Sequence, residues 1–167
     1  MSLVVEDGSV VAGANSWVTR AEVITYAAAR GITLADDVTT DRLAIDAQEF
    51  ISAHEPNLIG DRVSREQTTA YPRSNLYIQG FEWDDDEIPR QVILCQLAYT
   101  LELSQGIDIY NPDPIRTRKK EKIDGAVEVE YFGTDTSFKL SRDSKASALL
   151  ASLLNRSGLF SVTLERR

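Results

Sequence analysis

The segment between Pro89 and Gly106 constrains the fold more than any other part of the chain. Nine apolar side chains between these two residues leave almost no polar face, which is typical of a helix surrounded by other elements. Proline is tolerated in the first turn of a helix, and glycine commonly follows the last turn. We therefore expect a central helix here, with Leu97 and Leu101 buried.

Two further helices are indicated by their ends. Thr19 and Glu22 have the spacing of a capping box, and Gly31 fits the left-handed position after a last turn, so we expect a helix over residues 20–30. Another helix is expected to begin near residues 39–41 and to end before Pro56. Its continuous face comprises Leu43, Ala47, Phe50, Ile51 and His54.

Beyond the central helix the chain changes character. The Asn-Pro-Asp-Pro sequence at residues 111–114 cannot continue a helix. Alternating apolar residues predict strands at 126–132 and 160–164, with a leucine-rich helix between them. We divide the chain into a helical core domain with a short N-terminal strand, residues 1–106, and a C-terminal arm for partner contacts, residues 107–167. The expected fold class is mainly α: a helical bundle core with a C-terminal extended arm containing short β-strands and one helix.

The sequence gives little sign of catalysis. It lacks a phosphate-binding loop, a dinucleotide-binding turn and a nucleophile elbow, and it has one histidine, His54, and one cysteine, Cys95. The acidic run from Glu82 to Glu87 lacks the ligand spacing of a calcium loop, which favours a solvated loop over a metal site. We expect no enzyme activity, cofactor or metal. Catalysis by paired carboxylates stays open, because sequence does not reveal their pairing in space.

Net charge and hydropathy limit the surroundings of the protein. With 26 acidic and 18 basic residues the formal net charge is −8, so the isolated molecule should repel nucleic acid. No segment approaches the roughly 18 consecutive apolar residues of a membrane span, and the amino terminus does not resemble a signal peptide. We expect a protein that stays in the host cytoplasm until assembly, without membrane contact.

Four phrases occur in a fixed order along the chain. They are Val5-Glu6-Asp7-Gly8 running on to Ala14-Asn15-Ser16-Trp17-Val18, then Ala70-Tyr71-Pro72-Arg73, then Ile88-Pro89, and last the segment from Lys120 to Tyr131. In these phrases the chain resembles the head-to-tail connector, or adaptor, proteins of tailed bacteriophages. Relatives in that group are also described as DnaT-like single-stranded DNA-binding proteins, so the resemblance carries two functions.

The resemblance implies a structural virion protein in the neck between capsid and tail. Such a connector forms a ring, a dodecamer in the virion, that docks under the portal protein and extends the DNA channel. It offers a surface to tail-terminator or head-completion proteins, and double-stranded DNA passes through without sequence-specific binding. The resemblance alone implies this ring and its partners.

The residues expected to contact partners lie in the arm. A basic run could orient a partner, and apolar faces of the two predicted strands could pair with a neighbour. These residues are Arg116, Arg118, Lys119, Lys120, Lys122, Val127, Val129, Tyr131, Phe160, Val162 and Leu164. The alternative is a DnaT-like single-stranded DNA-binding protein, which would need a basic groove interleaved with exposed aromatic side chains. The sequence favours a linker role for the basic run.

Overall fold

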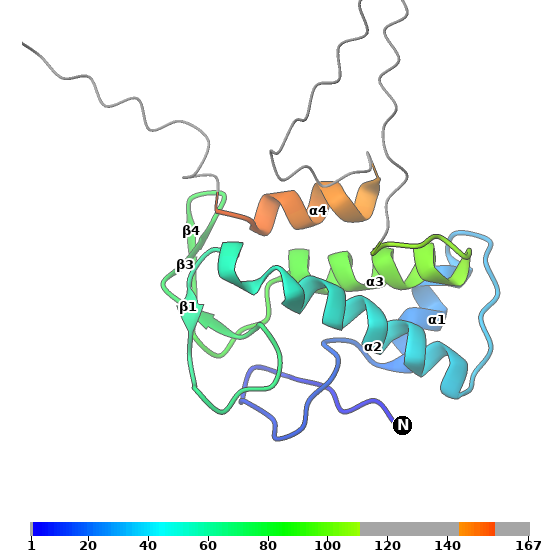
Figure 1. Cartoon of the computed structure of the whole chain (residues 1–167), viewed down its shortest axis with the longest axis horizontal. Helices are drawn as coiled ribbons and strands as arrows, with labels where there is room; N and C mark the ends of the chain where they lie inside the picture. The colour runs from blue at the N-terminus through cyan, green and yellow to red at the C-terminus, as the bar shows by residue number, and fades with distance from the viewer. Residues whose placement is uncertain (1, 111–143, 156–167) are drawn as a thin grey trace, which may run out of the picture.

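A computed structural model of the chain describes residues 2–110 and 144–155 (Figure 1). The described residues form four α-helices, one 3-10 helix and two antiparallel sheets of two strands each. In chain order the elements are α1 (Arg20–Ala28), α2 (Val38–Ala53), η1 (Glu55–Asn57), β1 (Asp61–Arg62), β2 (Arg73–Ser74), β3 (Leu76–Ile78), β4 (Phe81–Trp83), α3 (Arg90–Ser104) and α4 (Lys145–Leu153).

The expected fold class, a mainly α helical bundle core, is wrong. The described part is a mixed α and β structure, because β1 pairs with β2 and β3 pairs with β4 in the stretch between α2 and α3. Strands of two or three residues are too short to show a convincing alternation, and the turn formers around them indicated a loop. The N-terminal strand is also reduced, to a single bridge between Val5 and Ser16.

Helix α3 is the centre of the fold, as its sequence predicted. It contacts each of the other three α-helices, and Figure 1 shows α2, α3 and α4 stacked, with the sheets gathered at one end. Residues 95–100 are all buried. Cys95 is a small buried side chain of this core, and its burial raises the pKa of its thiol. Leu97 is buried as expected, whereas Leu101, one turn further on, is only partly buried.

The helix ends largely follow the predicted chemistry. The Thr19 and Glu22 capping box is present at α1, and Gly31 has a positive φ of 73°. Helix α2 begins slightly earlier than expected, because Asp37 caps it by accepting a hydrogen bond from the Thr39 amide. The chain leaves α2 through η1, which has Pro56 in its first turn.

Helix α4 belongs to the same core as α3. Ala146, Leu150 and Leu153 are completely buried, and the Cys95 thiol donates to the Ala146 carbonyl at 3.7 Å. Beyond the helix, residues 153–155 run antiparallel to residues 57–59, with two backbone hydrogen bonds of 3.0 and 2.7 Å. The helix expected in this part of the arm is therefore confirmed, and it closes one side of the core.

Candidate functional site

Two of the phrases that carried the family resemblance, those with Trp17 and Tyr71, meet inside the molecule. The Trp17 ring meets the Tyr71 ring edge-to-face at 5.9 Å, and its indole nitrogen donates to the Tyr71 carbonyl at 3.4 Å. Both side chains are buried. The Trp17 amide in turn donates to the side-chain oxygen of Gln96 on α3 at 2.9 Å. These residues therefore hold the scaffold together and cannot contact a partner.

The first phrase is also organised around a buried group. The Glu6 carboxylate is 1% exposed and accepts hydrogen bonds from the amides of Gly8, Val10 and Val11, each 2.9 Å long. Three amide donors compensate a buried carboxylate for lost hydration. Gly8 has a φ of 107°, and a Cβ there would lie 1.7 Å from the Asp86 carbonyl oxygen. The first loop thus packs directly on the acidic loop that precedes α3.

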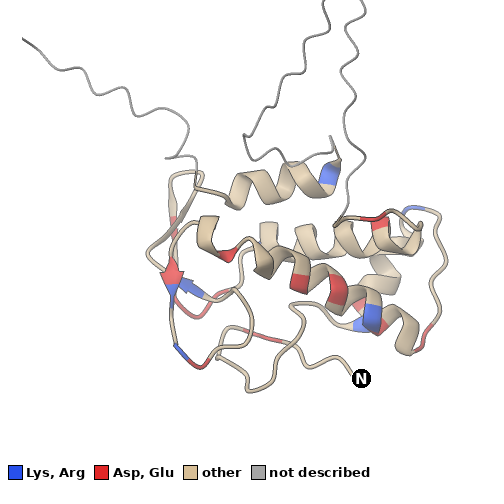
Figure 2. Cartoon of the chain, in the orientation of Figure 1, with Lys and Arg blue, Asp and Glu red and all other residues tan. Residues whose placement is uncertain are grey.

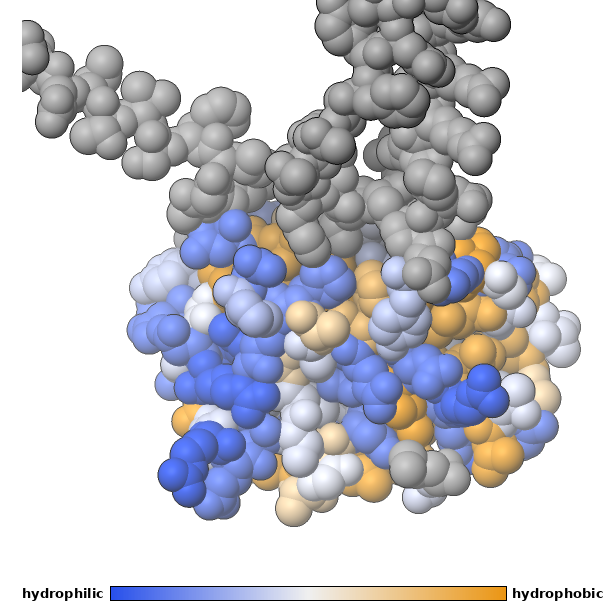
Figure 3. Space-filling model, in the orientation of Figure 1, coloured by the Kyte–Doolittle hydropathy of each residue, from blue (hydrophilic) through white to orange (hydrophobic). Residues whose placement is uncertain are grey.

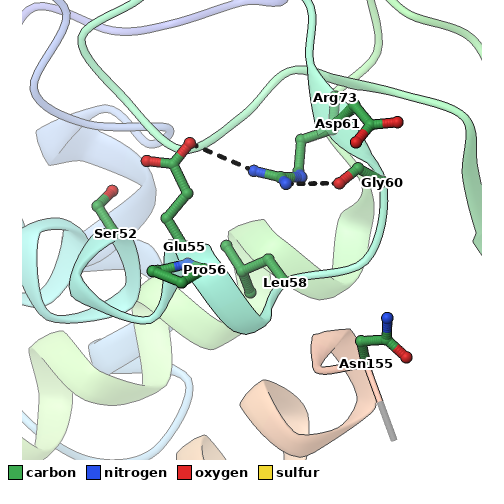
Figure 4. Close-up of a pocket in the computed structure, with 8 residues that line it drawn as sticks. All are labelled: Ser52, Glu55, Pro56, Leu58, Gly60, Asp61, Arg73 and Asn155. Carbon is green, nitrogen blue, oxygen red and sulfur yellow. Dashed lines mark hydrogen bonds and ion pairs between the residues drawn. The ribbon is translucent and has the colours of Figure 1, made fainter. Parts of the chain in front are cut away.

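A polar pocket of about 560 Å³ lies where α2, η1, the first sheet and the end of α4 meet (Figure 4). Arg73 is its main cation, with a side chain only 7% exposed. Its guanidinium donates to the carbonyls of Ile59, Gly60 and Ala70, and it pairs with Glu55 at 3.4 Å. Figure 4 shows Arg73 reaching between Glu55 and Gly60. Its donors are already engaged by the protein, so it is poorly placed to capture an anionic ligand.

Glu55 has a second arginine partner. Arg62 forms a two-pronged ion pair with it, in which the guanidinium Nη2 donates to the Glu55 Oε2 atom at 2.8 Å. The pKa of Glu55 is lowered, mainly by the hydrogen bond from Arg62 and further by the charge of Arg73. Arg62 also donates to the Gln67 carbonyl at 2.9 Å, which ties together the loop between β1 and β2. The charged residues around the pocket therefore stabilise the conformation of this loop.

The described part of the chain is strongly acidic. It holds 18 of the 26 acidic residues but only eight of the 18 basic ones. Arg20, Arg42, Arg62 and Arg73 are paired with carboxylates. In Figure 2 the blue segments, which mark Lys and Arg, are scattered along the ribbon and do not form a stripe. Nothing in this part of the chain provides the basic groove that single-stranded DNA binding requires.

Exposed aromatic side chains also lie among carboxylates. Tyr77 is 53% exposed and Phe81 is 73% exposed, both on the β3–β4 hairpin. The pKa of the Tyr77 phenol is raised by its hydrogen bond to Glu82. The acidic run from Glu82 to Glu87 begins in β4 and forms the loop that follows it. Its acidic side chains are exposed, as the sequence predicted. A base that stacked on these rings would bring its phosphates toward carboxylates, which is unfavourable.

The sequence did not reveal the exposed positions of Tyr77 and Phe81 on the hairpin. Leu76 and Ile78 are buried on either side of exposed Tyr77, and the turn at Gln79 and Gly80 follows. This alternation next to a glycine-containing turn was a usable hairpin signal, although only three residues long.

The partner-contacting residues expected from the sequence lie outside the described residues. They are Arg116, Arg118, Lys119, Lys120, Lys122, Val127, Val129, Tyr131, Phe160, Val162 and Leu164. Their assignment stays a prediction. Among the residues that are described, no group of three His, Cys, Asp or Glu side chains is placed to hold a metal ion. None of the described helices is both long and apolar enough to cross a membrane.

Comparison with known proteins gives one result. The model of the family described as "Putative DnaT-like ssDNA binding protein" matches residues 1–167. No match was found among curated proteins or among solved structures.

Proposed function

Because this chain belongs to the DnaT-like single-stranded DNA-binding family, two functions have to be weighed, and we propose that it acts as a structural connector. In this proposal it forms a ring beneath the portal of a tailed bacteriophage and offers a docking surface to the next component of the neck. The observation that carries the proposal is the charge of the described body, with 18 acidic residues against eight basic ones.

An acidic body suits a protein that lines a path for DNA but must not hold it. DNA repels a surface of like charge, so it can slide past without being trapped. The paired arginines reinforce this argument. Arg20, Arg62 and Arg73 are engaged by carboxylates of their own chain and offer little to a phosphate.

The buried contacts of the family phrases at Trp17 and Tyr71 give the proposal a second support. Trp17, Tyr71 and Gln96 join the N-terminal loop, the first sheet and α3 into one body. Such a scaffold can present a defined outer surface to protein partners, which is what a connector needs.

Single-stranded DNA binding is the second candidate, and the family description favours it. No comparison names a connector. For DNA binding, the positive charge would have to come mainly from the ten basic residues outside the described body, because that body is acidic. Five of the ten are clustered from Arg116 to Lys122. Both functions are therefore open to a direct test with the full chain.

The test is a fluorescence anisotropy titration with a labelled oligo-dT of about 30 nucleotides at 50 and 200 mM salt. A connector should show no saturable binding tighter than about 10 μM at either salt concentration. Submicromolar binding with a steep salt dependence would establish the second candidate. In that case, changing the five basic residues from Arg116 to Lys122 to Gln should abolish binding, whereas Arg30→Gln with Arg90→Gln in the body should not.

A separate assay examines the connector directly. The chain is mixed with purified portal rings from the same genome, and electron microscopy is used to look for an added ring of density beneath each portal. The same mixture is also sedimented, with the chain at tens of micromolar. If the chain does not sediment with the portal rings, the connector proposal is contradicted, whatever the anisotropy result.

A further inference from the structure

One face of the β3–β4 hairpin packs against the core, and the tip of the hairpin is exposed. Leu76 pairs across the strands with Trp83, and Ile78 pairs with Phe81, so these four side chains share a face. Leu76 and Ile78 are buried, whereas Phe81 at the tip is 73% exposed. Tyr77, on the opposite face, is also exposed. The hairpin thus presents two aromatic rings that the body does not cover.

Five carboxylates follow along the same element. Glu82, Asp84, Asp85, Asp86 and Glu87 are all exposed, and within the described residues none of them forms an ion pair. The surroundings of the hairpin are mostly hydrophilic on the face drawn in Figure 3, whereas apolar side chains gather toward the α1 end.

The acidic loop is held in a defined position. The Glu87 amide donates to the Asp84 carbonyl at 3.1 Å, which closes a turn. Gly8 packs against the backbone of Asp86 so closely that no side chain fits between them. Like charges fixed close together repel one another, and a cationic partner relieves that repulsion.

The same chain contains a segment of matching chemistry. Arg116, Arg118, Lys119, Lys120 and Lys122 place five cations within seven residues. A closed ring of more than two copies needs two different patches on each subunit, one of which contacts the other on the next copy. The acidic aromatic hairpin and the basic segment are such a complementary pair.

We propose that the β3–β4 hairpin of one copy binds the basic segment, residues 116–122, of a second copy. Carboxylates of the loop pair with the arginines and lysines, and Phe81 and Tyr77 provide stacking surfaces for the arginine guanidinium groups. The proposal rests on the proposed function in that it supplies the lateral contact of the ring. It concerns self-association and can fail while portal docking succeeds.

Sedimentation velocity of the full chain from 5 to 200 μM tests the contact. At 50 mM salt the wild-type chain should associate reversibly, and at 300 mM the apparent dissociation constant should rise at least tenfold, since exposed ion pairs are screened. A wild-type chain that stays monomeric over this range at 50 mM salt overturns the proposal. This outcome includes the case in which residues 116–122 bind the hairpin of their own copy.

Charge reversal identifies the two patches. Asp84→Lys with Asp85→Lys, and separately Lys119→Glu with Lys120→Glu, should each reduce association at least tenfold. Mixing the two variants should restore it, because each reversed patch then meets its opposite on the other chain. Failure of the mixture to associate overturns the proposal.

Two further variants separate the contact from general charge effects. Glu49→Lys with Glu66→Lys changes net charge by the same amount at exposed sites away from the hairpin, and it should leave association within twofold of wild type. Phe81→Ser should weaken association several-fold without lowering thermal stability, because its side chain is mostly exposed. An equal loss in the Glu49 and Glu66 control would overturn the assignment to the hairpin.

Discussion

Replacing Gln96 by Met tests whether one buried amide joins the N-terminal loop to two helices. Gln96 is completely buried, and its side-chain oxygen accepts from the Trp17 amide at 2.9 Å. Its side-chain nitrogen donates to the Ser16 hydroxyl and to the Ala44 carbonyl, both at 2.8 Å. Met has nearly the same length and volume, so the substitution removes hydrogen bonds without leaving a cavity.

The magnitude depends on what each partner retains. The Ser16 hydroxyl keeps its hydrogen bonds to Val18, and Ala44 lies within α2, so both keep other partners. The buried Trp17 amide loses the one hydrogen bond that it donates to a side chain, and an unsatisfied buried donor costs about 1–3 kcal/mol. With about 1 kcal/mol more for the other two bonds, Gln96→Met should lower the free energy of unfolding by about 2–4 kcal/mol.

Gln91→Met on the same helix is the matched control. The Gln91 side-chain oxygen is buried and has no hydrogen-bond partner among the described residues, so removing it should change stability by less than about 0.5 kcal/mol or increase it. Urea unfolding followed by tryptophan fluorescence measures both variants. If Gln96→Met and Gln91→Met shift the midpoint equally, the reasoning that assigns a joining role to Gln96 is refuted.

Three other substitutions probe the loop contact, the buried ion pair and the fourth helix. Gly8→Ala should destabilise by more than about 2 kcal/mol because its Cβ would overlap the acidic loop, while Gly13→Ala, with open space around it, should cost only about 1 kcal/mol. The pKa of Asp41 is lowered, mainly by its hydrogen bond from Arg20. The contribution of Asp41 to the free energy of unfolding is therefore full above about pH 4 and is lost as pH falls through its lower folded-state pKa. Asp41→Asn should make the free energy of unfolding, measured by urea unfolding, less dependent on pH below about pH 4. Leu150→Ala should cost about 2–5 kcal/mol by urea unfolding, whereas the exposed Ala148→Ser should stay within about 0.5 kcal/mol.

Local chemistry was predictable from the sequence where it depends on neighbours in the chain. The capping box at Thr19 and Glu22 needs only residues three apart, and it is formed as expected. Gly31 and Pro56 mark helix ends for the same reason. The central position of α3 was also predictable, because a helix without a polar face has to be surrounded.

Long-range polar contacts were not predictable in this way. Gln96 is a polar residue in an apolar helix, and its partners Trp17 and Ser16 lie about 80 residues earlier. The local sequence Asp7-Gly8 predicts a turn. The structure shows a second reason for glycine at this position, because the backbone of Asp86 leaves no room for a Cβ. The two sheets were missed because strands of two or three residues are too short to show a convincing alternation.

Within the described residues, the family phrases at Trp17 and Tyr71 and the exposed groups of the β3–β4 hairpin are separate sets. Trp17 and Tyr71 belong to two of these phrases, and both are buried against each other, with Gln96 holding the Trp17 amide. These two phrases therefore constrain how the chain folds more than what it binds. The binding question is decided by exposed groups such as Phe81 and the carboxylates after it. These groups form an acidic, aromatic surface, which attracts cationic polypeptide and repels phosphate. For that reason the reversal of Asp84 and Asp85 is more informative about function than a change at the buried residues Trp17 and Tyr71.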